Sequence, residues 1–331
     1  MTRNDLFYTV KPFIPRALQL ALRRGAVTRK RSHSMELWPI DYHAGGIPAG
    51  WNGWPNRKKF ALVLTHDIDT LRGQMKAPSL IRLEQELGFK SAFYVVPERY
   101  RVFPETLRLM AGSGFEIGVH GLKHDGKLFR SRLQFDADAV RINRYLREWN
   151  AEGFRAPSMI RNLDWIGELN IRYDASTFDT DPFEPQSEGV GTIFPFWIPR
   201  KNSPGGFVEL PYTLAQDFTL FILMKERSTE LWKRKLEWIV EKNGMALINT
   251  HPDYINFSGH RLGPEEYPIS RYRDFLEYIK HRYAGQYWSA LPRDIAAFWR
   301  HTIILRQTEP FAGEPFMHLH AAPRMQLERA P

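Results

Sequence analysis

The sequence contains no cysteine among its 331 residues. This absence excludes disulfide scaffolds, thiolate zinc sites and cysteine nucleophiles, so any metal site must use histidine and carboxylate ligands. No apolar run approaches the roughly 20 residues that cross a bilayer, and the opening stretch MTRNDLFYTVKPFIPRAL lacks the layout of a signal peptide. We therefore expect a cytoplasmic protein, and 43% hydrophobic with 25% charged residues is typical of a folded domain with a large core.

Acidic residues are scarce at the N-terminus. Residues 1–33 carry eight Lys and Arg against Asp5 alone, a net charge of +7, which leaves only +2 for the rest of the chain. Because the positive charge is confined to one arm, we expect no nucleic-acid partner. Leucines and arginines are interleaved from Arg16 to Arg24, so residues 1–33 could lie as an amphipathic helix on the anionic inner face of a membrane. The alternative is a helix packed on the outside of the domain.

Short apolar runs alternate with segments of helical period from residue 60 onward, which predicts repeated β-α units. The expected strands are Phe60–Thr65, Ser91–Val96, Phe115–Val119, Gly153–Arg155, Asn170–Tyr173, Phe207–Leu210 and Met245–Thr250. The expected helices include Leu80–Leu87, Glu105–Ala111, Phe135–Trp149 and Leu231–Lys242. Continuous apolar strands indicate burial on both faces, and hence a mostly parallel sheet covered by helices, either a barrel or a doubly wound sheet.

Three regions are expected along the chain. Residues 1–58 form a basic, partly helical extension, residues 59–305 form the β/α unit, and residues 306–331 form a C-terminal tail without clear periodicity. Within the β/α unit, the Pro- and Gly-rich stretch 182–204 predicts an irregular excursion.

Ionisable residues follow the ends of five predicted strands. They are Asp67 and Asp69 after the first strand, then His120, Arg155, Asp174 and His251 after later ones. The carboxyl ends of parallel strands meet at one edge, where the loops of barrels and open sheets build active sites. We therefore expect these side chains to share one site.

The spacing of two histidines and two aspartates suggests a metal site. His120 and His124 are four residues apart, so on a helical turn both could reach one ion, although such pairs also occur on surfaces and in hydrogen-bonded cores. Asp67 and Asp69 can face the same side of an extended segment, although Asp-x-Asp also caps helices. Two His and one Asp leave coordination positions for water and substrate, and the second Asp could then accept a proton.

Two further residues suit acid-base chemistry at that site. Arg155 could clamp a carboxylate and keep it ionised, unless it is a surface arginine. His251 ends a buried strand, and imidazole is well suited to protonate a leaving amine near neutral pH.

This ordered set resembles the polysaccharide deacetylases of the NodB-homology type, carbohydrate esterase family 4, over roughly residues 60–251. The second motif of that family is similar to Glu116-Ile-Gly-Val-His120 with His124, and the third to Arg155-Ala-Pro157. The first motif, usually Thr-Phe-Asp-Asp, reads Thr65-His-Asp-Ile-Asp69 and is similar to an Asp-x-Asp variant of allied members.

The resemblance implies a role for each matching residue. Asp67 is the expected base, and Asp69, His120 and His124 are the expected metal ligands. His251 is the expected acid and Arg155 positions the base. Ser158 stands where an aromatic residue is common, so only its backbone N–H remains to stabilise an oxyanion. The fourth motif matches loosely, and Asp174 is the expected partner of His251, with Asp179 or Asp181 as substitutes.

The resemblance also implies a fold and an activity. The expected fold is a distorted barrel of seven or eight β-α units, within an α/β class. The expected activity is metal-dependent removal of an acetyl group from an N-acetylated sugar in a polysaccharide, glycan or lipid-linked saccharide. Zinc is the ion such ligands favour first, with cobalt, nickel or manganese also compatible.

Two rival functions stay open. One is hydrolysis of another non-peptide carbon–nitrogen bond, and the other is a non-catalytic glycan-binding or assembly protein with the same fold. The aromatic residues expected to offer a sugar-stacking surface are Trp165, Phe194, Phe196, Trp197 and Tyr212.

Overall fold

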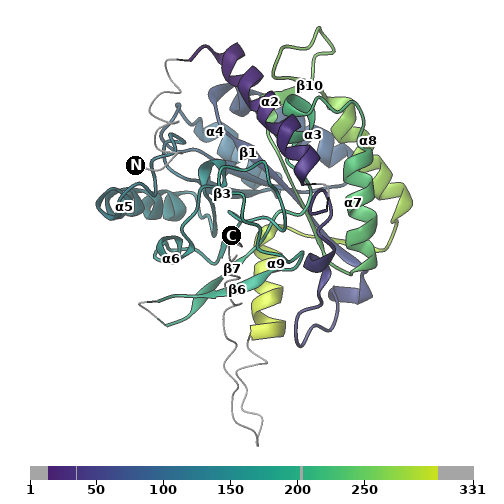
Figure 1. The fold of residues 1–331 in the computed structure, drawn as a ribbon. Coiled ribbons are helices and arrows are strands. Elements are labelled where there is room, and N and C mark those ends of the chain that lie inside the picture. The colour runs from purple at the N-terminus through teal and green to yellow at the C-terminus, as the bar shows by residue number, and fades with distance from the viewer. Residues whose placement is uncertain (1–13, 35, 202–203, 305–331) are drawn as a thin grey trace, which may run out of the picture.

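A computed structural model describes residues 14–34, 36–201 and 204–304 (Figure 1). Its main sheet contains parallel strands at all seven predicted places. They are β1 (Phe60–Ile68), β2 (Ala92–Val95), β3 (Glu116–His120), β4 (Gly153–Arg155), β5 (Tyr173–Asp174), β7 (Gly206–Glu209) and β8 (Met245–Thr250). Each of them except the amino end of β7 is buried along its length, as the continuous apolar runs predict.

The sheet curls until its two sides meet. β8 pairs with β1 over Ala61–His66, and beyond the regular ladders Phe178 bridges Tyr212 while Leu214 bridges Ile248 of β8. The parallel strands are thereby joined in a ring whose last connections are single bridges rather than full ladders. The prediction of a distorted α/β barrel is confirmed.

Two strands of the sheet were not predicted. β6 (Phe196–Pro199) is antiparallel to β7 and lies inside the stretch expected to be irregular. β11 (Tyr287–Ser289) pairs with the first residues of β1, while β2 pairs with its last residues, Thr65–Ile68. Both strands are short and half-exposed, so neither leaves the apolar run by which the others are recognised.

Helices cover the outer face of the barrel (Figure 1). They are α3 (Leu71–Leu87), α4 (Pro104–Gly112), α5 (Arg132–Glu148), α6 (Leu163–Ile166), α7 (Glu230–Glu241), α8 (Ile269–Arg282) and α9 (Pro292–Trp299). Helix α3 starts nine residues before the predicted Leu80, because the Thr70 hydroxyl accepts a hydrogen bond from the Arg72 N–H and so caps the helix.

Further short elements complete the described chain. Single turns or π-helical segments are η2 (Tyr42–Gly45), η3 (Pro55–Arg57), η4 (Pro157–Met159), η5 (Phe218–Leu223), η6 (Pro252–Tyr254) and η7 (Arg300–Ile304). A small two-stranded sheet joins β9 (Ile255–Asn256) to β10 (Tyr267–Pro268) just after the end of β8.

The basic arm forms helix α2 (Arg16–His33), which packs on the barrel. Leu20 and Val27 are buried in the main hydrophobic core, and so are Ala44 and Trp54 from the rest of the extension. The described part of the extension therefore shares one core with the barrel, and one side of α2 faces protein. No described helix is long and apolar enough to span a membrane. The division at residue 58 stays a prediction, and the expected tail lies outside the described residues.

Glycines make room for two tyrosines inside the barrel. A Cβ on Gly118 would overlap the ring of Tyr94, and a Cβ on Gly153 would overlap the ring of Tyr173. The Tyr173 hydroxyl donates to Oε1 of Glu116 at 2.6 Å, and the Tyr94 hydroxyl donates to that of Tyr173 at 3.2 Å. These hydroxyl and carboxyl groups satisfy one another in the barrel interior, where unpaired polar groups are costly.

We expect Gly153→Ala to destabilise the fold, because the added methyl group must displace the Tyr173 ring and its hydrogen bonds. Overpacking of this kind costs about 1–3 kcal/mol of unfolding free energy, and thermal or urea unfolding would measure it. Gly25→Ala is the matched control, since a Cβ at Gly25 of α2 meets no atom within 4 Å and removes a helix-destabilising glycine. Equal stabilities of the two variants would contradict the account of the barrel interior.

Candidate functional site

Strand β1 carries the two aspartates to the carboxyl end of the barrel. Thr65, Asp67 and Asp69 alternate along the chain and face inward, as the period of a strand requires. His66 faces the helical layer instead, where its Nε2 lies 2.8 Å from Oε1 of Glu84 on α3. This motif differs from Thr-Phe-Asp-Asp by His66 in place of Phe and by the extra residue Ile68, and both side chains are buried.

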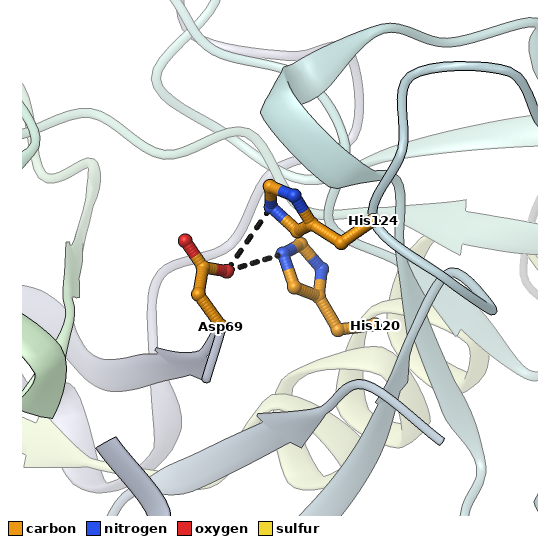
Figure 2. A group of neighbouring side chains, drawn as sticks. All are labelled: Asp69, His120 and His124. Carbon is orange, nitrogen blue, oxygen red and sulfur yellow. Dashed lines mark ion pairs between the residues drawn. The ribbon is translucent and has the colours of Figure 1, made fainter. Parts of the chain in front are cut away.

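Asp69, His120 and His124 converge as predicted for metal ligands (Figure 2). One carboxylate oxygen of Asp69 lies 3.4 Å from Nε2 of His120 and 3.1 Å from Nε2 of His124. The three ligand atoms lie within 4.8 Å of one another, and the shared oxygen, Oδ1, is buried and makes no hydrogen bond. An unpartnered carboxylate oxygen facing two imidazole nitrogens is a donor set that fits a divalent cation.

The backbone around the two histidines is held in an unusual conformation. His124 has φ +53° and Gly121 has φ +57°, both in the left-handed region. A Cβ on Gly121 would overlap the ring of Pro157, so this turn requires glycine. To hold the non-glycine residue His124 in this region costs of order 1–3 kcal/mol of conformational free energy. Strained residues of this kind cluster at functional sites, where the direction of the side chain matters.

His120 is fixed in one tautomer by the neighbouring strand β4. Its Nδ1–H donates to the carbonyl oxygen of Arg155 at 3.0 Å, which leaves Nε2 as the lone-pair nitrogen that faces the carboxylates. Orientation of a ligand histidine through its other nitrogen is common to metal sites.

The carboxylate of Asp67 is held by two hydrogen bonds. Its Oδ1 accepts from Nη1 of Arg155 at 2.9 Å, and its Oδ2 accepts from Nδ2 of Asn249 at 2.8 Å. Burial alone would raise its pKa, but the positive charge of Arg155, with that of His251, leaves the pKa of Asp67 below the usual value. Asp67 is therefore ionised at neutral pH and able to accept a proton.

Arg155 is fully buried and is not a surface arginine. In addition to Asp67, its guanidinium donates to the carbonyl oxygen of Ala175 at 2.8 Å and to Oδ1 of Asn249 at 2.8 Å. The same group lies 4.2 Å from the centre of the Tyr94 ring. Its position is thus set by strands β1 and β8, by the residue that follows β5, and by the Tyr94 ring.

The expected contact between Asp174 and His251 is wrong. His251 Nδ1 lies 2.7 Å from Oδ1 of Asp217, and the backbone N–H of His251 donates to the other oxygen of Asp217 at 2.8 Å. Burial lowers the pKa of His251, but the Asp217 carboxylate raises it to about 10. His251 therefore carries a proton at neutral pH, and its Nε2 lies 3.8 Å from Oδ2 of Asp67.

The three aspartates proposed for that contact bind elsewhere. Asp174 accepts from the Ser176 hydroxyl at 2.7 Å, Asp179 pairs with Lys235, and Asp181 accepts from the Tyr212 hydroxyl at 2.8 Å. Asp217 follows no predicted strand and shows no motif spacing, so the sequence reasoning missed it. The sequence held only a weak signal: Asp217 stands directly before the apolar run Phe218–Leu223, and in the structure it caps η5 by accepting from the Phe218 N–H at 2.8 Å.

Of the remaining predicted residues, Ser158 follows a strand of the site, while the proposed sugar-stacking residues lie in the core or on β6. Ser158 lies in η4, directly after the Arg155 strand, with φ +55°. Of the proposed sugar-stacking residues, Phe194 and Tyr212 are buried in the core, and Trp165 packs beside Phe135. Phe196 and Trp197 are half-buried on β6. An aromatic ring outside this predicted set, Tyr254, does lie beside the site, 5.2 Å from the ring of His251.

Comparison with known proteins agrees with the geometry. Residues 55–162 match the family model described as polysaccharide deacetylase. No curated protein matches the chain. A putative polysaccharide deacetylase from Mycobacterium smegmatis has a similar structure, with 20% identity, a TM-score of 0.60, and 82% of this chain and 99% of that chain covered.

Two other solved structures share the fold. PuuE allantoinase has 17% identity and a TM-score of 0.60, with 80% of this chain and 98% of that chain covered. A probable polysaccharide deacetylase from Pseudomonas aeruginosa PAO1 has 18% identity and a TM-score of 0.57, with the same shares covered. Residues 55–162 are therefore similar in sequence to polysaccharide deacetylases, and the chain shares the fold of these solved structures.

Proposed function

We propose that this protein is a metal-dependent hydrolase that removes the acetyl group from an N-acetylated sugar, within a glycan or a lipid-linked saccharide. The observation that carries the proposal is the position of Asp67. Its Oδ2 lies 3.7 Å from Nε2 of the ligand candidate His120 and 3.8 Å from Nε2 of His251. A base, a protonated acid and a ligand set thus meet at one point, as amide hydrolysis requires.

Each of these residues has a distinct part in the reaction. Asp69, His120 and His124 would hold a divalent cation, zinc first, which supplies a Lewis acid that polarises the acyl carbonyl. Asp67 accepts the proton of the attacking water, and Arg155 keeps it ionised and aimed. His251 donates its proton to the departing amine. The Ser158 N–H is a donor for the oxyanion that forms between these steps.

A second candidate is hydrolysis of a small cyclic or linear amide. It is favoured by the allantoinase, whose TM-score equals that of the Mycobacterium smegmatis protein. A non-catalytic glycan-binding role is disfavoured by the presence of base, acid and ligand candidates together. The cytoplasmic location inferred from the N-terminal sequence stays a prediction.

Acetate release tests the proposed function. We expect zinc-loaded protein to release acetate from N-acetylated oligosaccharides and not to open allantoin, and Asp67→Asn to lower the rate by about 10²–10⁴ because the base is removed. Asp164→Asn, an exposed carboxylate paired with Lys201, is the control and should act like the wild type. Opening of allantoin without acetate release would favour the second candidate. If the protein shows neither activity, the non-catalytic glycan-binding role would be favoured instead.

Metal content per chain tests the ligand set without any choice of substrate. Protein purified without chelators and reloaded with zinc should hold about one ion, and His124→Ala should lose it because two ligands remain. His281→Ala, on the exposed side of α8, should retain the metal. Zinc should also raise the melting temperature of the wild type and not of His124→Ala. If the wild type binds no zinc or cobalt, the hydrolase proposal fails.

The pH profile tests the partner of the acid. Above its pKa of about 10, His251 has no proton to donate, so activity should fall there. Asp217→Asn removes the charge that raises this pKa, and the alkaline limb of kcat/KM should therefore move down by about 1–3 pH units. Asp174→Asn is the matched buried control and should leave the limb in place. A shift in the Asp174 variant and none in the Asp217 variant would reverse the assignment.

A further inference from the structure

A cavity opens at the amino end of the barrel, opposite the candidate site. Part of its wall consists of residues that directly precede parallel strands: Glu152 before β4, Arg172 before β5 and Gly205 before β7. Residues of α9 and η7 complete the wall, and α9 packs beside β7 (Figure 1). The cavity measures about 450 Å³, which is within the range of small-molecule sites.

Positive side chains outnumber negative ones in the wall of this cavity, which contains four arginines and one acidic residue. Nε of Arg172 lies 3.6 Å from Oε2 of Glu152, so these two form an ion pair. The Arg293 guanidinium interacts electrostatically with the buried Glu116, whose Oε2 also accepts from the Arg293 backbone N–H at 3.1 Å. Even when both carboxylates are counted as charged, two arginines of the wall have no acidic partner among the described residues. These are Arg200 and Arg300.

Arg200 is held in place by backbone groups. Its Nε donates to the carbonyl oxygen of Gly167 at 2.7 Å, and its Nη2 donates to those of Leu169 at 3.1 Å and Ile171 at 3.0 Å. Carbonyl oxygens are neutral, so the positive charge remains, and Nη1 makes no hydrogen bond within the described chain. Because the side chain is already ordered, it loses little conformational entropy when it binds an anion.

Arg300 and Trp197 give the cavity a cation and an aromatic surface. Arg300 is exposed on η7, and its side chain forms no hydrogen bond or ion pair with residues that the structure describes. Trp197 is half-buried on β6, and its ring packs over Gly206, where a Cβ would lie 2.6 Å from Cζ2 of the indole. Guanidinium groups match phosphate oxygens in a bidentate manner, and an indole favours contact with a ring.

We propose that this cavity is a second binding site, for a small molecule that joins a ring to a chain of phosphates, as a nucleoside diphosphate does. The ring packs on Trp197, and the phosphates accept hydrogen bonds from Arg200 and Arg300. Arg172 and Arg293 add positive charge around them. The four guanidiniums come from separate segments and border a space larger than one carboxylate fills, which favours a diphosphate. The site is independent of the proposed function, because none of these residues belongs to the hydrolytic set.

Calorimetric titration of the zinc-loaded full chain tests the ligand class. The probes are ADP, which carries both a ring system and a diphosphate, and adenosine and inorganic diphosphate, which carry one each. We expect ADP to bind most tightly, to raise the melting temperature, and to bind more weakly at about 500 mM than at about 50 mM salt because screening weakens charge attraction. Absence of ADP binding would overturn the site. Equal affinities for ADP and either fragment would overturn the ligand class.

Arg300→Gln tests the position of the site. We expect this variant to bind ADP at least about tenfold more weakly, because a charged donor to phosphate is lost, while Arg300→Lys keeps the charge and retains part of the affinity. The fold should be unaffected, since the Arg300 side chain is exposed. Arg108→Gln is the matched control, because Arg108 is an exposed arginine of α4 outside the cavity wall. Equal ADP affinities in Arg300→Gln and Arg108→Gln would contradict the proposal.

His124→Ala separates this site from the candidate metal site. ADP should bind this variant with the affinity of the wild type, because the cavity lies at the opposite end of the barrel. Loss of ADP binding in His124→Ala and not in Arg300→Gln would place the nucleotide at the candidate metal site and reject the cavity. Acetate release has no part in these titrations, so the second site can fail while the hydrolase proposal holds, and the reverse.

Discussion

The buried guanidinium of Arg155 is the interaction on which the site depends. A charge without exposure to solvent is tolerated only when its donors are satisfied, and here they are shared among Asp67, Thr65, Asn249 and the Ala175 carbonyl. These partners belong to β1, β8 and the chain after β5. The Arg155 carbonyl meanwhile accepts from His120 Nδ1 and from the Gly121 N–H at 3.0 Å each. One residue thus fixes both the base and the orientation of a ligand candidate.

Two histidines of the site, His120 and His251, differ in what holds their Nδ1 atoms. His120 Nδ1 donates to a neutral carbonyl oxygen, so its Nε2 faces the Asp69 carboxylate, as a ligand nitrogen would. His251 donates to a buried carboxylate, which stabilises the imidazolium and favours a ring that gives up a proton. The group that binds Nδ1 therefore decides whether a histidine of this site suits the role of ligand or of acid, and the position of the histidine in the sequence does not. Asp217 also accepts a hydrogen bond from the Tyr267 hydroxyl at 2.9 Å, so its carboxylate stays fixed when His251 gives up its proton.

The parts of this arrangement that follow regular strands could be predicted from the sequence. Asp67, Asp69, His120, Arg155 and His251 each stand at the end of an apolar run, and parallel strands bring such ends together. Asp217 could not be found in this way, because the chain between β7 and β8 closes the barrel through the single bridge of Leu214 to Ile248. That irregular closure leaves no hydrophobic period. Asp174 does end a strand, but its carboxylate is taken by the adjacent Ser176, a local bond that competes with any distant partner.

The position of α2 also could not be predicted from the sequence, although its positive charge could. Periodicity identifies an amphipathic helix, but a membrane surface and the helix's own barrel both suit a face such as that of Leu20 and Val27. In the fold this face is buried, and two arginines pair with acids of distant loops, Glu265 and Glu226. The barrel's own core therefore covers this face, which periodicity could not show because it identifies the apolar side of a helix but not the surface that covers it.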